Sequence, residues 1–202
     1  MGGTWPVELR GVTESVVTAL GPNERYNVAA LGLHAPTTGE HDRVTARTWG
    51  RTRTWRNFRE RGEGYVQFTR DPVVFVEAAL DVREQDEPIL DSADAWVRVS
   101  VERLGAGSEA GTQWVDWALT PEDSEVNRRI VPAFNRGYGA VVEATVAASR
   151  LDVDGYDRDK LEARIEYFSR VVERCGGPRE RAAFDRLREI LDGEQSQFER
   201  TR

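Results

Sequence analysis

The residues with the clearest chemical potential lie in the segment RTWGRTRTWRNF, which runs from Arg47 to Phe58. At its centre, Arg51, Thr52 and Thr54 follow a glycine at the point where strand-like alternation changes to helical spacing. A helix N-terminus presents unpaired backbone N–H groups and a partial positive charge. A guanidinium and two hydroxyls placed there would add further ligands for a phosphate. The segment therefore indicates a site for a phosphorylated ligand.

The same segment also has an interpretation that needs no ligand. Thr52 or Thr54 can serve simply as the N-cap of the helix. Arg53 and Arg56 can form a solvated face, with Arg56 paired to Glu60 one helical turn later. From these residues alone, both interpretations stay open.

The surrounding sequence predicts mostly strands at first and only helices later. Alternating or apolar runs predict strands over residues 13–20, 25–34, 43–49, 64–69, 95–103 and 112–119. A helix follows the third strand, another begins at Pro72, and polar residues 83–93 are expected to form a loop. Helices are expected over 134–150, about 157–175 and 178–192. This order predicts a mainly β protein with α: a small antiparallel Greek-key-type barrel followed by a C-terminal helical segment.

The helix expected over residues 134–150 is unusual because it carries few charges. Its large side chains are expected on one face: Phe134, Tyr138, Val141, Val142 and Val146. Its charged residues, Arg136, Glu143 and Arg150, lie seven apart and form one stripe. Such a helix is expected to be buried on most sides.

Composition limits the possible functions. The chain has 35 acidic and 28 basic residues, and Lys160 is its single lysine. An acidic surface nearly free of lysine suits a protein adapted to high salt, although high genomic GC content would also favour arginine over lysine. Dialysis into low salt tests the first explanation, and unchanged stability there would count against it. Cys175 is the single cysteine, and His34 and His41 are too few for a typical zinc site. Without a long apolar run or a signal-peptide pattern, we expect a cytoplasmic protein that does not bind membranes.

Four motifs, in this order along the chain, carry a family resemblance. ESVVTALGPNERYNVAALGLHA, RTWGRTRTWRNF, GYVQFTRDPVVF and FNRGYGAVVEATVAASRL resemble a small uncharacterised family of FMN-binding split-barrel proteins, related in fold to flavin reductases. The resemblance implies a split-barrel flavin-binding domain over residues 5–122 and a C-terminal helical domain over 123–195. It also implies a homodimer with FMN near the subunit interface.

The resemblance places the cofactor on the residues singled out above. The phosphate would lie at Arg51, Thr52 and Thr54, with Asn57 one turn further along the helix. The isoalloxazine ring would lie along a strand with few bulky side chains, beside Asn27, Val28, Ala29, Ala30 and Gly32. That strand could equally be one crowded by a neighbouring helix.

Three further residues have two interpretations each. Trp49 or Trp55 could stack on the flavin ring, although the pattern favours core packing for both. Arg136 could reach the phosphate or the partner subunit, or it could pair with Glu143. His34 could protonate a substrate, but a histidine at a strand end is more often a partly buried polar residue.

The leading functional hypothesis is a flavin-dependent oxidoreductase or flavin reductase of unknown substrate, with NADH or NADPH as a possible electron donor. A second hypothesis is a non-catalytic sensor of FMN or another phosphorylated ligand. A third is nucleic-acid binding through the arginines and aromatic residues of segment 47–61. The net charge of −7 argues against the third, so no nucleic-acid partner is expected.

Overall fold

The computed structural model describes residues 3–37, 43–109, 111–131 and 133–200, with 194–200 as backbone alone. His41 lies outside these residues. In chain order the elements are β1 (Val12–Leu20), β2 (Tyr26–His34), β3 (Val44–Trp49), α1 (Arg53–Arg61), β4 (Glu63–Thr69), α2 (Pro72–Leu80), β5 (Arg83–Gln85), β6 (Ala93–Glu109), β7 (Thr112–Val126), α3 (Arg136–Ala148), α4 (Arg158–Cys175) and α5 (Pro178–Arg200). No helix among them combines the length and apolar character needed to cross a membrane.

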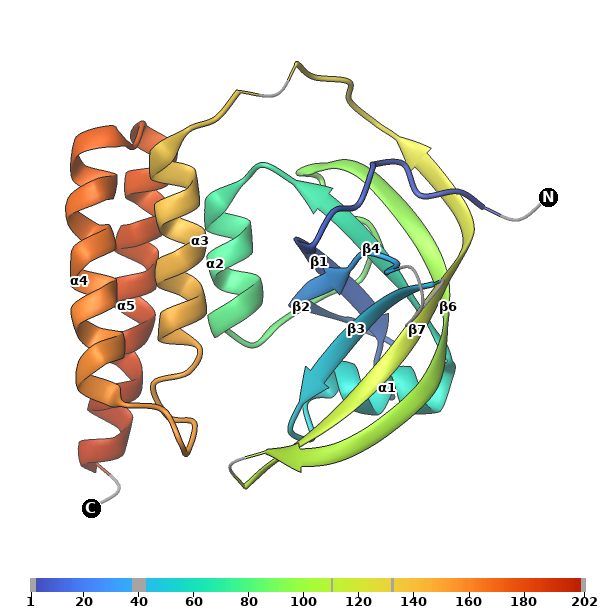
Figure 1. The fold of residues 1–202 in the computed structure, drawn as a ribbon, viewed down its shortest axis with the longest axis horizontal. Coiled ribbons are helices and arrows are strands. Elements are labelled where there is room, and N and C mark those ends of the chain that lie inside the picture. Colours follow the sequence, from blue (N-terminus) through green and yellow to red (C-terminus); the bar gives the residue numbers. More distant parts are fainter. Residues whose placement is uncertain (1–2, 38–42, 110, 132, 201–202) are drawn as a thin grey trace. The chain divides into compact units, whose positions relative to one another are not determined.

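Six of the described strands form a closed antiparallel barrel. They are hydrogen-bonded in the order β1-β4-β6-β7-β3-β2, and the pairing of β2 with β1 closes the ring. The β1–β2 hairpin turns at Gly21, whose backbone N–H donates to the carbonyl of Arg25 at 2.8 Å. Figure 1 shows these strands curving around a common interior. The prediction of a small antiparallel barrel followed by helices is confirmed.

Three elements differ from the sequence prediction. Residues 83–85, expected in a loop, form the short strand β5, which pairs with Tyr26–Val28 at the edge of β2. Strands β6 and β7 are longer than expected, because they pair with each other from Ala95–Val126 to Glu109–Thr112. Helix α3 begins after Asn135, so Phe134 precedes it and is fully exposed instead of lying on a buried face.

The described chain divides into two compact units. The first is built from the described residues within 1–70 and 82–130, and the second from those within 71–81 and 131–202. The division expected near residue 122 falls inside β7, which continues to Val126. Helix α2, although it lies between two barrel strands in sequence, belongs to the helical unit.

The buried residues of α3 are mostly small, although Val141, one of the large side chains expected on one face of this helix, is also fully buried. The apolar cluster of the helical unit joins Val76 of α2 to Ala140, Val141 and Ala144 of α3, and to Phe184 of α5. The starts of α2 and α3 are capped by the side chains of Asp71 and Asn135, which accept hydrogen bonds from first-turn N–H groups. Small residues let helices approach closely, which explains why the buried face of α3 is rich in alanine.

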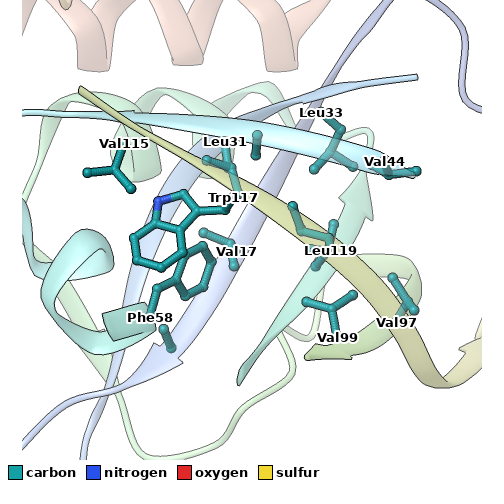
Figure 2. Packing of buried hydrophobic residues seen from close by; sticks show 13 residues of the cluster. Val17, Leu31, Leu33, Val44, Phe58, Val97, Val99, Val115, Trp117 and Leu119 are labelled. Carbon is teal, nitrogen blue, oxygen red and sulfur yellow. The ribbon is translucent and has the colours of Figure 1, made fainter. Parts of the chain in front are cut away.

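The barrel interior is filled by side chains that alternate along its strands, as Figure 2 shows. Phe58, from α1, enters this core and is 1% exposed. Its ring meets that of Trp117 edge to face, with centroids 5.6 Å apart. The Trp117 indole N–H in turn donates to the Thr48 hydroxyl at 2.9 Å. Helix α1 is therefore anchored to the barrel by its own core residue.

A buried amide fixes the segment that follows β5. The Gln67 side chain is fully buried and donates from Nε2 to the Thr18 hydroxyl and to the Pro88 carbonyl, both at 3.0 Å. Its Oε1 accepts from the backbone N–H of Leu90 at 2.7 Å. Breaking this network would leave buried polar groups unpaired, at a cost of about 1–3 kcal/mol each. Residues 86–90 are thus held on the outside of β1 and β4.

Gly64 provides a test of the packing beneath α1. A Cβ at this position would lie 2.9 Å from Phe58 Cε1 and 3.2 Å from the Thr18 carbonyl oxygen, whereas a Cβ at Gly105 of β6 would meet nothing within 4 Å. We expect Gly64→Ala to destabilise the barrel by about 1–3 kcal/mol through overpacking. Gly105→Ala is the matched control and should be neutral or slightly stabilising. Urea unfolding measures both, and equal effects would contradict this account of the core.

Candidate functional site

The site begins at a tight turn between β3 and α1. Gly50 has a φ of +68°, a backbone conformation that glycine adopts without the penalty of a side chain. Its N–H donates to the Gln113 carbonyl of β7 at 2.6 Å. This bond fixes the end of β3 and sends the chain directly into α1, with Arg51 and Thr52 at the bend.

Thr52 is the N-cap of α1. Its backbone is extended, with φ −65° and ψ 168°, and its hydroxyl accepts from the Trp55 N–H at 3.2 Å. The Arg56 N–H bonds to the Thr52 carbonyl at 3.1 Å, which starts the helical ladder. The alternative cap, Thr54, lies instead within the first turn. That turn contains no acidic side chain, so the partial positive charge of the helix start has no carboxylate of its own.

Arg51 differs from the arginines around it. Four neighbouring arginines each form an ion pair with a carboxylate. The pairs are Arg47–Asp116, Arg53–Glu84, Arg59–Glu60 and Arg61–Glu24. Within the described part of the chain, the exposed Arg51 forms no hydrogen bond or ion pair. Its guanidinium is therefore available for an anion at the start of α1.

Asn27 and Thr54 join β2 to the first turn of α1. Both are buried, at 6% and 5% exposure, and Asn27 Nδ2 donates to the Thr54 hydroxyl at 3.2 Å. Because that hydroxyl oxygen acts as acceptor, its own proton stays available for donation. The structure thus brings together four of the residues that the sequence indicated: Asn27, Arg51, Thr52 and Thr54.

Asn57 connects α1 to the barrel wall. Its Nδ2 donates to the Ala19 carbonyl of β1 at 3.0 Å, and its Oδ1 accepts from Arg56 Nε at 3.3 Å. Asn57 is 1% exposed, so both ends of the amide are engaged inside the protein. These bonds give Asn57 a structural role, and its contact with a phosphate stays a prediction.

The small residues of β2 lie on both faces of the strand. Ala29 packs against the barrel core together with Leu31, so Val28, Ala30 and Gly32 point the other way. Val28 is 1% exposed, whereas Ala30 and Gly32 are half-buried. A flat ligand along β2 would therefore meet Ala30 and Gly32 on the outer face.

The two tryptophans near the site have different surroundings. Trp55 is half-buried and packs against the barrel core, as the sequence favoured. Trp49 is 44% exposed, so the expectation of core packing is wrong for this residue. The reason is register: the core side of β3 is taken by the alternate residues, and Trp49 faces outward with its cross-strand partner Trp114.

Arg47 lies against the rings of both Trp49 and Trp114. Its guanidinium carbon lies 4.1 Å from the Trp114 ring centroid and 5.5 Å from that of Trp49. Two hydrogen bonds to the Asp116 carboxylate, at 2.7 and 2.9 Å, fix its plane and raise the pKa of Arg47. The exposed ring of Trp49 therefore lies near a guanidinium that Asp116 holds in place, and Trp49 directly precedes Gly50 and Arg51 in the chain.

Arg136 and His34 belong to other elements of the chain. Arg136 is the first residue of α3 and belongs to the helical unit, and the Glu143 considered as its partner pairs with Arg164 of α4. His34 is exposed at the end of β2. Among the described residues, no group of three or more His, Cys, Asp or Glu side chains could hold a metal ion.

Glu84 is the site residue that sequence reasoning missed. It lies opposite Asn27 in the pairing of β5 with β2, and its Oε1 accepts from Arg53 Nη1 at 2.6 Å. In sequence, Glu84 is one of several acids in a polar stretch of residues 83–93. Only the tertiary pairing of β5 distinguishes it from the others.

Family models match both halves of the chain. Residues 13–128 match the N-terminal domain of a protein of unknown function, DUF447, and residues 135–189 match a second DUF447 model. Among solved structures, the chain is similar to the FMN-bound protein MM1853 from Methanosarcina mazei, also of the DUF447 family. The two are 25% identical with a TM-score of 0.74, over 90% of this chain and 96% of that one. These matches confirm the family resemblance drawn from the sequence motifs.

Flavin reductases are more distant neighbours. The styrene monooxygenase flavin reductase from Pseudomonas putida S12 is 13% identical, with a TM-score of 0.39 over 60% of this chain and 93% of that one. BorF, the flavin reductase component of a bacterial two-component tryptophan halogenase, is 14% identical, with a TM-score of 0.43 over 58% and 81%. At this level of similarity they do not inform the chemistry of this chain.

Proposed function

This chain belongs to the DUF447 family, and we propose that it is an FMN-binding protein. Support comes from MM1853, which shares the family and is bound to FMN. It also comes from the start of α1, where a helix N-terminus without an acidic side chain adjoins the guanidinium of Arg51, which has no partner in the part of the chain that the structure describes. Flavin absorbance bands in the purified protein, or saturable titration with FMN, would test the proposal.

The residues at the start of α1 fit a terminal phosphate. Backbone N–H groups of the first turn and the Arg51 guanidinium would donate to the phosphate oxygens, and the Thr54 hydroxyl has a proton to donate. The Thr52 hydroxyl accepts from Trp55, which orients that first turn. The flavin ring would lie on the outer face of β2, beside Ala30 and Gly32, with Trp49 as a candidate for stacking.

We further propose that the protein is a flavin-dependent oxidoreductase or flavin reductase. FMN supplies two-electron redox chemistry when bound, so the protein needs to contribute only binding, orientation and access. The residues near α1 suit that task, since they position an anion and present an exposed aromatic ring. A role as a non-catalytic FMN sensor is the alternative within the same proposal.

The arginine-rich segment gives less support to nucleic-acid binding. Arg47, Arg53, Arg59 and Arg61 are each paired with a carboxylate in the barrel unit. These pairs reduce the positive potential that a phosphate backbone would need.

A homodimer is part of the proposal. Phe134 is fully exposed and Val131 is 94% exposed, and both precede α3 closely. Large exposed apolar side chains grouped in this way are typical of surfaces that a partner covers. A second copy of the chain is the partner that we propose.

Removing the Arg51 guanidinium should weaken FMN binding selectively. Charge-assisted hydrogen bonds are worth roughly 1.5–3 kcal/mol, so Arg51→Ala should lower FMN affinity by about tenfold or more and leave riboflavin nearly unaffected. Fluorescence titration with both flavins measures this. Arg103→Ala is the control, because Arg103 is also exposed and without a partner among the described residues. Equal losses for the two flavins would rule out the phosphate role of Arg51.

The chain should be a dimer at micromolar concentration in high salt. Light scattering gives the molar mass directly, and Phe134→Ala should shift the population toward monomer because it removes exposed apolar area. A wild-type monomer under these conditions would contradict the proposed assembly.

The proposed oxidoreductase should accept electrons from a nicotinamide donor. Anaerobic mixing of the FMN-loaded protein with NADH or NADPH should bleach the flavin absorbance within the time of a stopped-flow or manual-mixing experiment. No bleaching with either donor, at full FMN occupancy, would favour the sensor or a different electron donor.

A further inference from the structure

Glu84 places a carboxylate beside the start of α1 from a different part of the barrel. Its Oε1 accepts from Nη1 of Arg53, the first residue of the helix, at 2.6 Å. The Glu84 side chain is 20% exposed and that of Arg53 is 44% exposed. Glu84 is also the register partner of Asn27, whose amide donates to Thr54 in the first helical turn. Glu84 thus adjoins the proposed phosphate site.

The Glu84 carboxylate is held in this position by several bonds. Its Oε2 accepts from Asn23 Nδ2 at 3.1 Å, so both carboxylate oxygens are engaged. Its backbone carbonyl accepts from Arg25 Nη2 at 3.3 Å, and its strand pairs with β2. The residues that follow β5 are fixed by the buried Gln67 amide. The side chain of Glu84 is therefore held at a fixed place beside the start of α1.

A fixed carboxylate at this place affects any anion that binds to the helix start. The first turn of α1 has no acidic residue of its own, so Glu84 supplies the nearby negative charge from β5. It also binds one of the two arginines, Arg51 and Arg53, that flank Thr52. A bound phosphate would be repelled by the carboxylate and would compete with it for Arg53.

We propose that Glu84 is a specificity-determining residue of the phosphate site, because it withholds Arg53 and leaves Arg51 as the guanidinium that recognises the ligand. This inference rests on the proposed function. Glu84 weakens the contribution of the phosphate, so a ligand must also gain affinity from contacts of its ring system. An anion without a flavin ring therefore binds poorly, although the helix N-terminus and Arg51 are available to it.

The proposal predicts that removing the charge of Glu84 raises the affinity for FMN. Glu84→Gln should strengthen FMN binding by about two- to fivefold, the range expected for one partly exposed charge, and leave riboflavin unchanged. In the Arg53→Ala background no guanidinium is released, so Glu84→Gln should keep only the part of the gain that comes from the removed repulsion. Titration of the flavin-free full-length chain with FMN and riboflavin gives all the dissociation constants. The gain should shrink in high salt because exposed charges are screened.

Glu102→Gln is the matched control. Glu102 pairs with Arg43 at 2.7 Å, an ion pair of similar length on the barrel surface. Its substitution should change the affinity for neither FMN nor riboflavin. Thermal unfolding shows whether each variant folds. Should Glu84→Gln not fold, Glu84→Asp, which retracts the carboxylate from Arg53, should give a smaller gain that is again specific for FMN.

The outcomes separate this inference from the proposed function. Unchanged or weaker FMN binding by Glu84→Gln, an equal gain for riboflavin, or a full gain in the Arg53→Ala background would each overturn the role of Glu84. If the wild type binds FMN and Arg51→Ala weakens it selectively, the proposed function survives that result. If the wild type binds neither flavin, both fail together.

Discussion

The anchoring of α1 to the barrel is the constraint on which the candidate site depends. Phe58 is buried against Trp117, and Gly64 leaves the space that its ring occupies. The Asn57 amide ties the same helix to the Ala19 carbonyl. Truncating a buried phenylalanine costs about 3–5 kcal/mol, so this anchor is strong enough to fix the helix. Because the core holds the helix, its first turn stays beside β2 and the guanidinium of Arg51.

Much of the barrel could be predicted from local sequence, because its strands alternate and its turns contain glycine. The prediction failed where tertiary pairing decides the structure. β5 has three residues, too few for a periodic signal, and forms by pairing with the edge of β2. In α3, hydrophobicity suggested that Phe134 would be buried, whereas close helix packing selected alanines such as Ala140 and Ala144. Side-chain size is a poor guide where backbones approach closely.

The candidate site was predictable where it depends on helix geometry and not where it depends on charge partners. Sequence spacing placed Thr52 and Thr54 at the helix start, and backbone geometry assigned the cap to Thr52. The sequence spacing did not indicate that Arg53 pairs with Glu84 while Arg51 stays unpaired among the described residues. Partners of opposite charge far apart in sequence meet only through the fold. Available charge, more than the number of arginines, therefore defines the site.

Within a chain of net charge −7, the start of α1 is a favourable place for an anion, because Arg51 has no charge partner among the described residues. The central claim is that the phosphate of FMN occupies this place. A crystal structure of the chain with FMN tests it most directly. Our account predicts the phosphate within hydrogen-bonding distance of first-turn N–H groups of α1 and of the Arg51 guanidinium. A phosphate bound elsewhere, with Arg51 and the helix start free of it, would contradict the account.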